Sequence, residues 1–361
     1  MKKIKKLDVL VVYSAAIALS ATVLDTHSKK PFLVDSARAN YNVSYAYFLN
    51  HCKTQGLSAG FTSSSDITGP GTCSSYWTQT PSGWTKVNHS AQSNQIFDKL
   101  SPSSTKRAAE RTLLLSDNSV TPFNDPTLFQ IFYDKLVTYR QFSDYAIPTS
   151  DIYSSRPRDI HISITRLRKL LREHPFPDDF STAIVLKDRF GAGGNHVYKV
   201  STNMPVKINQ IMLENPKIKF VIQPFLHFDK GYTYKNRQAA TDIRLIIQHN
   251  QLLQCYIRIA KGDDFRCNQH QGGELIYLTD LEIPPLVNKI ASKLMTKINK
   301  PHSLYALDFV ISNAGRVYFI EGNSNPGIDW TLTSKLSQNK GQRLIRRIIS
   351  ELTHRVNTNH S

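Results

Sequence analysis

The chain has 361 residues, 40% of them hydrophobic, which is long enough for two or three domains and excludes a disordered chain. Lys and Arg number 45 against 28 acidic residues. The resulting net charge of +17 favours anionic partners such as nucleotides, acidic peptides, nucleic acid or a membrane surface. The basic residues are spread along the chain rather than gathered in one arm, which is typical of a generally basic, solvated surface.

The N-terminus fits two interpretations. Basic residues at positions 2–6, followed by the largely apolar stretch from Leu7 to Leu24, resemble a signal peptide. The alternative, which we favour, is a core strand from Asp8 to Tyr13, because Asp8 interrupts the apolar stretch and a compact apolar run of residues 9–12 follows it. No other segment approaches the roughly 18 apolar residues of a membrane span, so no membrane partner is expected.

The four cysteines predict no metal site. Cys52, Cys73, Cys255 and Cys267 form no Cys-x-x-Cys pair, and no histidine cluster completes a zinc pattern. Reduced thiols are therefore expected, with a Cys52–Cys73 disulfide as the alternative.

Hydrophobic patterning predicts alternating helices and strands with no internal repeat. The first part contains a helix over 43–55, a strand over 59–62, loops around short strands over 62–105, and renewed order over 107–115. A domain boundary is expected near residue 118. Beyond it we expect a helix over 125–142, an extended piece at 147–149, a basic amphipathic helix over 164–174, a strand over 182–186, a helix over 206–215, a strand over 219–225, a hairpin of 243–248 with 252–259, a helix over 283–298, a hairpin of 303–312 with 316–321, and a closing helix over 336–355.

The last hairpin sets the position of two acidic side chains. Two apolar strands flank a turn that contains glycine, and we centre that turn on residues 314–315. This register places Phe309 opposite Ile320 and Asp308 opposite Glu321. Directly opposed Cβ atoms lie about 4.5–5.5 Å apart, so the two carboxylates are predicted to be neighbours.

Two carboxylates at that distance repel each other unless a cation neutralises them. Asn323 lies two residues after Glu321 and so shares its face of the strand. Three oxygen-bearing side chains suit Mg²⁺, which prefers carboxylates together with phosphates and waters. The alternative is a carboxylate pair neutralised by Lys or Arg, or protonated.

Lysines and glycines upstream are candidates for binding phosphate. Lys187 ends an apolar strand, and Gly191, Gly193 and Gly194 follow in the next turn. Backbone N–H groups of such a loop can surround phosphate oxygens, and a lysine adds a point charge. Lys135 is a second candidate. The pattern is not the Walker motif, and each feature alone is also typical of an ordinary turn or a surface lysine.

A strand end and a basic stretch complete the candidates. Pro224 lies in the strand over 220–226, and a strand end with free backbone groups could recognise adenine, although an ordinary edge strand fits equally well. Further on, residues 242–273 contain several arginines, an asparagine and a Gly-Gly pair. These suit anionic ligands, with a solvated basic loop as the alternative; the side chains are Arg244, Arg258, Arg266 and Asn268.

The order of these motifs resembles the ATP-grasp superfamily, most closely its RimK-type branch of carboxylate–amine (glutamate) ligases. The resemblance covers residues 128–330. It rests on Tyr133-Asp-Lys, Val185-Leu-Lys with Gly-x-Gly-Gly, Ile222-Gln with Phe225-Leu226, Asp242-Ile-Arg, Asp264-Phe-Arg-x-Asn with Gly-Gly, Asp308, and Glu321-Gly-Asn-x-x-Pro-Gly.

The resemblance implies an α/β fold in which two lobes clasp ATP, preceded by a small α/β domain. The small domain would comprise residues 1–117 and the ATP-grasp domain residues 118–361, with lobes of about 118–225 and 226–361. ATP and one or two Mg²⁺ ions, or Mn²⁺, are the implied cofactors. A glutathione synthetase-like ATP-binding domain in the cytoplasm is expected.

The resemblance also implies roles for the candidates. Phosphates would contact Lys135, Lys187 and the glycines; adenine would lie at Gln223, Phe225 and Leu226; metal would bind Asp308, Glu321 and Asn323; and Arg266, Asn268, Arg258 and Arg244 would orient the transferred phosphate or the substrate carboxylate. Three features depart from the family pattern. Pro224 stands where the hinge usually carries Glu, His196 where the loop often has Gly, and residues 228–240 are longer and more basic than usual.

The implied reaction joins a carboxylate, of a small molecule or a peptide, to the amine of an amino acid through an acylphosphate. A second hypothesis is an ATP-grasp kinase that phosphorylates a hydroxyl group. A third is a non-catalytic basic protein that binds nucleic acid or anionic membrane. We disfavour the third, and expect no nucleic-acid partner, because no stacking motif or recognition helix accompanies the charge.

Overall fold

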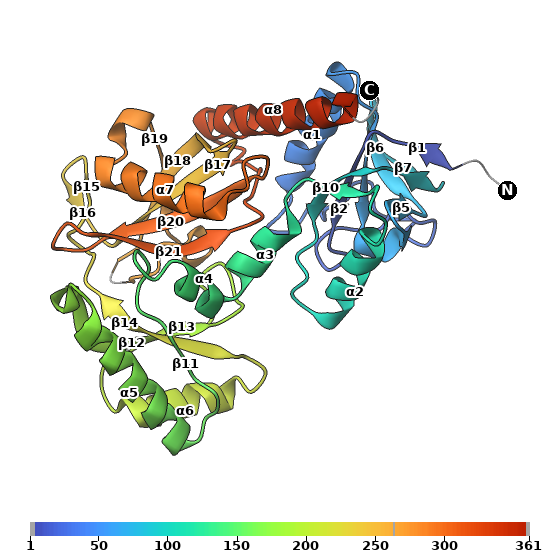
Figure 1. The fold of residues 1–361 in the computed structure, drawn as a ribbon. Helices are drawn as coiled ribbons and strands as arrows, with labels where there is room; N and C mark the ends of the chain where they lie inside the picture. Colours follow the sequence, from blue (N-terminus) through green and yellow to red (C-terminus); the bar gives the residue numbers. More distant parts are fainter. Residues whose placement is uncertain (1–3, 263, 359–361) are drawn as a thin grey trace. The chain divides into compact units, whose positions relative to one another are not determined.

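The computed structural model describes residues 4–262 and 264–358 (Figure 1). By packing, the chain divides into two compact units. The first comprises residues up to 126, residues 302–304 and residues from 325 onward. The second comprises residues 127–301 and 305–324. Each unit is described by itself below.

The first unit is built on a six-stranded sheet of order β10-β9-β2-β3-β6-β7. Its strands are β2 (Val9–Tyr13), β3 (Ala59–Ser63), β6 (Tyr76–Thr80), β7 (Gly83–Val87), β9 (Gln95–Lys99) and β10 (Thr121–Pro122). β2 pairs in parallel with β3 and β9 and is buried along its whole length. The core strand predicted at the N-terminus is therefore confirmed, and the apolar run is explained by a central position in the sheet.

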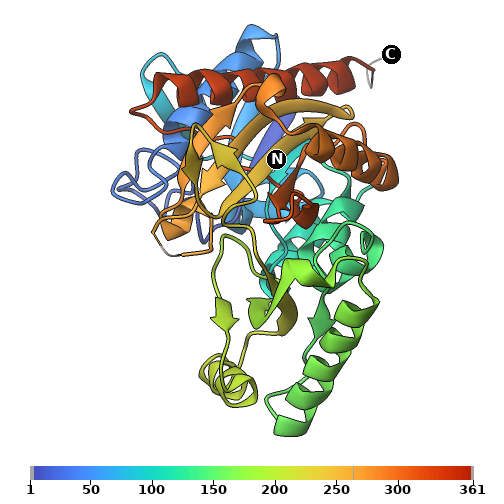
Figure 2. The ribbon, with the colours of Figure 1, turned by 90° about the vertical axis from the view of Figure 1, so that its left-hand side faces the viewer.

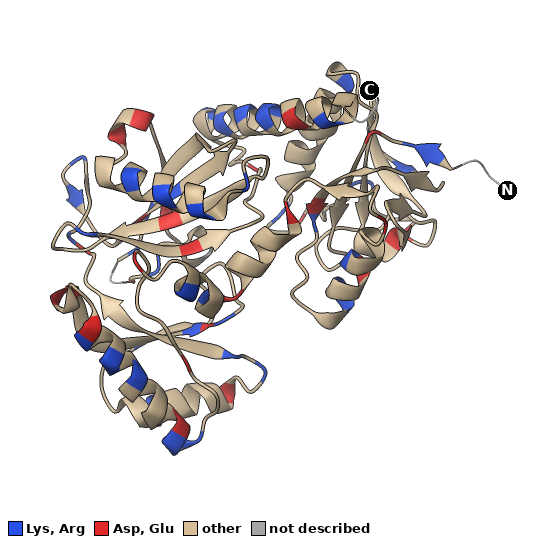
Figure 3. Cartoon of the chain, in the orientation of Figure 1, with Lys and Arg blue, Asp and Glu red and all other residues tan. Residues whose placement is uncertain are grey.

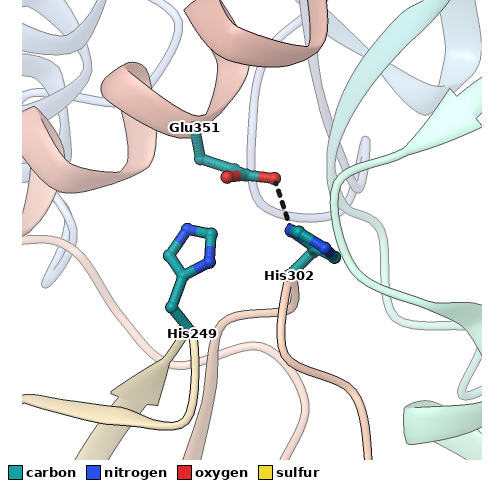
Figure 4. Close-up of side chains that lie close together, drawn as sticks. All are labelled: His249, His302 and Glu351. Atoms are coloured by element: carbon teal, nitrogen blue, oxygen red, sulfur yellow. Dashed lines mark ion pairs between the residues drawn. The ribbon is translucent and has the colours of Figure 1, made fainter.

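Short strands and three helices complete the first unit. β1 (Lys5–Lys6), β8 (Ala91–Gln92), β5 (Thr72–Cys73) and β4 (Ile67–Gly69) form a second small sheet. The helices are α1 (Tyr41–Thr54), α2 (Thr105–Leu114) and α8 (Lys335–Thr358), and α8 packs beside α1. Figure 4 shows Glu351 of α8 beside His302, whose Nδ1 lies 3.4 Å from a carboxylate oxygen of Glu351.

The second unit contains two sheets. The first, of order β11-β14-β12-β13, consists of β11 (Ser150–Asp151), β14 (Phe220–Leu226), β12 (Phe180–Asp188) and β13 (Val197–Val200). The helices α5 (Pro157–Glu173) and α6 (Met204–Glu214) lie side by side against this sheet (Figure 2). Their apolar sides bury Ile160, Ile164 and Ile208 against Leu186 and Ile222, which anchors the strands that reach the candidate site.

The other sheet of this unit has the order β19-β18-β17-β20-β21. Its strands are β17 (Thr241–Gln248), β18 (Gln251–Ile259), β19 (Glu274–Leu278), β20 (Tyr305–Ile311) and β21 (Val317–Asn323). Both predicted hairpins are confirmed by the pairing of β17 with β18 and of β20 with β21. His249 and Asn250 turn the first hairpin with φ of 54° and 53°. A core that includes α7 (Pro285–Ile298) packs against this sheet.

Two expectations need correction or detail. The single helix predicted over 125–142 is wrong, because the segment forms α3 (Pro126–Tyr133) and α4 (Lys135–Gln141). Asp134 ends the first and caps the second, accepting a hydrogen bond from the Leu136 amide at 2.9 Å. The unusual stretch at 228–240 contains a small hairpin of β15 (Thr233–Tyr234) and β16 (Arg237–Gln238).

The remaining chain-wide expectations concern thiols, charge and membranes. All four cysteines are free and buried, so the Cys52–Cys73 disulfide does not form. Lys and Arg lie on many elements, including α5, α7 and α8 (Figure 3), as the even distribution along the sequence predicts. Across residues 4–262 and 264–358, no helix has both the length and the apolar character needed to cross a bilayer.

Candidate active site

A cavity in the second unit lies between the two sheets and has an apolar end and a charged end. The apolar end is lined by Ile147, Val185, Phe225, Leu226, Phe228, Val310 and Ile320. The charged end is lined by Lys135, Lys187, Asp188, Asp242, Arg258, Arg266, Asn268, Asp308 and Glu321. Such a cavity suits a ligand that is apolar and flat at one end and strongly anionic at the other.

The start of α4 is fastened to the glycine loop of residues 191–194. Asp134 accepts two hydrogen bonds from Arg189, Nε to Oδ1 at 2.7 Å and Nη2 to Oδ2 at 2.5 Å. The Lys135 amide donates to the Arg189 carbonyl at 3.1 Å, and its ammonium group donates to the carbonyl of Gly191. Lys135 is therefore held at the mouth of the loop rather than free on the surface.

Lys187 is the second cation at this end of the cavity. It is the penultimate residue of β12, half-buried, and pairs across the sheet with Val197 and Val221. Burial lowers the pKa of Lys187 to about 8, while the nearby charge of Glu321 acts in the opposite direction. A lysine in this state gains a large electrostatic benefit from an anionic ligand.

The glycine loop also approaches the loop that follows β18. Gly193 and Gly194 have φ of 73° and 76°, which a residue with a Cβ adopts only with strain. A Cβ on Gly194 would lie 2.6 Å from Oδ1 of Asn268, so the glycine permits this close contact. His196 has φ of 50°, which gives a physical reason why a glycine is favoured there.

The strand β14 has a free edge where adenine is expected. β11 pairs with Val221 and Ile222 and then ends, while Pro224 is paired with Ile184 on the other side. The strand beyond Ile222 therefore has no β11 partner on its outer edge, and a proline there interrupts no ladder. Gln223 is buried and donates from Nε2 to Thr149 Oγ1 at 2.8 Å.

The carboxylate hairpin has the predicted acidic pair but a different register at its turn. Asp308 pairs with Glu321, as predicted. Phe309 pairs with Phe319 rather than Ile320, because a β-bulge between Asp308 and Phe309 leaves Ile320 as the extra residue. The bulge shifts the register by one residue between the turn and the carboxylates. The pairing of Phe309 with Ile320 was therefore wrong, whereas the acidic pair is confirmed.

Arginines neutralise the buried Asp308, whose exposure is 1%. Arg244 donates to both of its oxygens, from Nε at 2.6 Å and Nη2 at 2.5 Å, and Arg258 Nη2 donates to Oδ2 at 2.7 Å. Burial alone would raise the pKa of Asp308, but the charges and hydrogen bonds of Arg244 and Arg258 outweigh it and hold the pKa below its ordinary value.

A second carboxylate holds Arg258 from the other side. Asp242 accepts from Arg258 Nε and Nη2, both at 2.7 Å, and both side chains are buried. Burial raises the pKa of Asp242 to about 6, although Arg258 opposes the shift. In contrast, Arg266 at the cavity wall folds back onto Asp264, with Nη2 donating to Oδ2 at 2.8 Å.

The family model of the RimK-like ATP-grasp domain matches residues 167–348. The chain belongs to the RimK-like ATP-grasp family. Membership confirms the resemblance and the fold class read from the sequence, and ATP-grasp proteins generally use ATP and Mg²⁺.

Two curated relatives of this RimK-like protein match about half of the chain. It is 27% identical over 195 residues to an uncharacterised MG011 homologue of Mycoplasma pneumoniae, covering 54% of this chain and 55% of that protein. It is 28% identical over 173 residues to the tetrahydromethanopterin:alpha-L-glutamate ligase of Methanocaldococcus jannaschii, covering 48% of this chain and 55% of the relative. The chain thus spans about half the length of these relatives.

A solved structure extends the fold similarity to nearly the whole RimK-like chain. The D-cycloserine synthetase DcsG aligns with a TM-score of 0.59 over 96% of this chain and 99% of that one. At 12% sequence identity, the likeness concerns the fold alone.

The hairpin side chains fit a divalent cation of the kind the family uses. A carboxylate offers about four lone-pair positions, and the arginines occupy three on Asp308, so one on Oδ1 remains. The Glu321 carboxylate is half-buried and accepts no hydrogen bond from any described residue. Asp308 can thus bind Mg²⁺ through one oxygen, with Glu321 supplying the more open carboxylate.

The structure separates the predicted residues of this RimK-like site. Arg244, Gly193 and Asn323 lie outside the cavity lining, whereas the other predicted side chains and glycines all line it. The prediction missed Asp134, Arg189 and Asp242, which hold lining residues in place. Asp134 and Asp242 belong to the same sequence motifs as Lys135 and Arg244, so those motifs could have identified them as site residues.

Proposed function

We propose that this RimK-like protein is an ATP-dependent ligase that joins a carboxylate to an amine and releases ADP and phosphate. One observation carries the proposal: a single cavity joins the free edge of β14 to a charged end where two lysines face Asp308 and Glu321. Adenine would lie against Val185, Phe225 and the outer edge of β14. The triphosphate would extend toward the lysines and the glycine loop.

Asp308, Glu321 and Asn323 would hold one or two Mg²⁺ or Mn²⁺ ions. When bound, the metal neutralises charge on the transferring phosphoryl group. Lys135 and Lys187 would supply positive charge at the phosphates from fixed positions. Because the ammonium group of Lys135 is hydrogen-bonded before ATP arrives, little reorganisation of that lysine remains at the moment of reaction.

The reaction would proceed in two displacements. A carboxylate oxygen of the first substrate bonds to the γ-phosphorus of ATP while the bond to the ADP oxygen breaks. The amine nitrogen of the second substrate then bonds to the carbonyl carbon. Phosphate leaves with the electron pair of the broken carbon–oxygen bond and takes up the proton that the nitrogen loses. Arg258, Arg266 and Asn268 lie where they could orient the carboxylate and the transferred phosphoryl group.

The substrates are proposed by class. The carboxylate would belong to a small molecule or a peptide, and the amine to an amino acid. The glutamate ligase from Methanocaldococcus jannaschii supports glutamate as the first amine to test, although about half of that relative is matched. Four buried free thiols agree with a reducing compartment, so we place the reaction in the cytoplasm.

The test is ADP release with a panel of amino acids and short peptides, followed by hydroxylamine trapping. A ligase is expected to form a hydroxamate, because hydroxylamine intercepts the acylphosphate. Glu321→Gln serves as the inactive reference and the exposed Lys289→Gln as the folded control. ADP release without hydroxamate, together with a phosphorylated hydroxyl product, would favour the kinase, whereas ATP binding without any turnover would contradict both.

A further inference from the structure

Arg258 is shared between two carboxylates and has donors left over. Of the five N–H groups of a guanidinium, Nε–H binds Asp242 Oδ1, and Nη2 binds Asp242 Oδ2 and Asp308 Oδ2. The two N–H groups of Nη1 donate to no acceptor among the described residues. Arg258 lines the cavity, and its side chain is 6% exposed.

Arg244 is arranged differently. It also binds Asp308 through Nε and Nη2, but it lies outside the cavity lining. Its role is therefore to fix Asp308, whereas Arg258 both touches Asp308 and faces the cavity. The two arginines lie on adjacent strands of the sheet. Asp242 and Arg244 are on β17, and Arg258 on β18 is the strand partner of Asp242.

We propose that Asp242 is a positioning residue that aims Nη1 of Arg258 at the phosphoryl group being transferred. This inference rests on the proposed function. A bidentate pair fixes both the position and the plane of a guanidinium. Without Asp242, Arg258 could turn toward Asp308 and form a second bond with it. That movement would withdraw Nη1 from the cavity and occupy the last lone pair that Asp308 has for a metal.

The charge balance supports this role. Asp242 and Asp308 offset Arg244 and Arg258, so these four groups, of which all but Arg244 are buried, carry no net charge. Asp308 is already neutralised by Arg244 through two bonds. The second carboxylate is thus needed less for neutralising Asp308 than for limiting Arg258 to a single hydrogen bond with it.

The experiment measures binding by calorimetry with Mg²⁺ present. The two probes are ADP alone and ADP with aluminium fluoride, which mimics the transferring phosphoryl group and needs no second substrate. Asp242→Asn is expected to bind the fluoride complex about 10–100-fold more weakly, the range typical of residues that orient metal ligands, with ADP affinity unchanged. Mn²⁺ affinity of the nucleotide-free protein, followed by electron paramagnetic resonance, should fall as well.

The matched control is Asp179→Asn. Asp179 is also buried and holds Arg316 with two bonds of 2.7 Å in the same unit, but it lies outside the cavity lining. This variant should lose comparable stability and keep its affinity for the fluoride complex. If Asp179→Asn and Asp242→Asn lose that affinity equally, Asp242 has a structural role and the inference is overturned.

A double variant tests whether Asp242 acts through Arg258. In an Arg258→Gln background, Asp242→Asn should have no further effect on binding of the fluoride complex. An unchanged effect in that background would overturn the inference. If Asp242→Asn does not fold, Asp242→Glu replaces it, because glutamate keeps the charge but displaces it by one methylene. Its binding of the fluoride complex is then compared in the wild-type and the Arg258→Gln backgrounds in the same way.

The outcomes also separate this inference from the proposed function. A wild-type protein that binds the fluoride complex no more tightly than ADP overturns both. A wild-type protein that binds it tightly and forms no hydroxamate overturns the ligase alone, and the Asp242 comparison still stands.

Discussion

Replacing Lys187 with methionine is expected to stabilise the empty protein and to weaken ATP binding. Lys187 is half-buried at the end of β12, where burial lowers its pKa from 10.5 to about 8. That difference corresponds to about 3 kcal/mol by which the folded state disfavours the charged lysine. Methionine has a similar length and no charge, so Lys187→Met should raise the free energy of unfolding at pH 7 by about 1–3 kcal/mol.

The pH dependence gives the sign of this effect. Below pH 8 the lysine is charged in both the folded and the unfolded protein, so the whole penalty applies. Between pH 8 and 10.5 the unfolded protein binds more protons, and the wild type gains stability as the pH rises. The advantage of Lys187→Met should therefore shrink over this window and vanish above it.

Urea unfolding of wild type and variant at pH 7 and pH 10 measures the difference directly. An exposed lysine on α7, Lys289, provides the control, because Lys289→Met should change the free energy of unfolding by less than about 0.5 kcal/mol. ATP should restore the charged lysine, so wild type should take up protons on binding ATP at pH 9 and Lys187→Met should take up fewer. A variant that is less stable than wild type at pH 7 would refute the reasoning.

Three further predictions follow from the same cavity. Asp308→Asn should lower the free energy of unfolding by about 3–5 kcal/mol, measured in urea, because Arg244 and Arg258 lose a buried partner. Gly194→Ala should raise the KM for ATP without abolishing ADP release, because the added Cβ would lie 2.6 Å from Asn268 Oδ1 and push the two loops apart. Chelating divalent metal should stop ADP release but leave the melting temperature of the nucleotide-free protein unchanged, because arginines already neutralise Asp308.

Much of the fold could be predicted because its elements have strong local signals. β2 is a compact apolar run, and the turn between β17 and β18 has two residues that tolerate positive φ. The break between α3 and α4 was missed because the helical spacing of apolar residues continues on both sides of Asp134. An aspartate in a helical pattern predicts a break only when its side chain caps the next helix, and a partner such as Arg189 cannot be identified from local sequence.

The site was less predictable where it depended on pairing between strands. The Asp308–Glu321 pair could be found by counting from the turn. The count succeeded because two deviations cancel: the strands near the turn pair one residue out of the predicted register, and the bulge at Ile320 restores that register at Asp308. A bulge leaves no clear mark in a single sequence, and a shift of one residue reverses the face of every side chain.

The arginines show what pairing adds to a motif. Arg244, Arg258 and Arg266 are equivalent in the sequence, where each reads as a fork for an anion. In the structure, Arg244 binds Asp308 from outside the cavity lining, Arg266 binds Asp264 within its own loop, and Arg258 binds both Asp242 and Asp308 at the cavity wall. For Arg244 and Arg258 the difference arises from which carboxylate lies across each strand, since Arg244 pairs with Asp308 and Arg258 with Asp242. Arg258 is the arginine that contacts the candidate metal ligand Asp308 and also lines the cavity with its two Nη1 N–H groups unused, so it is the one expected to meet the phosphoryl group.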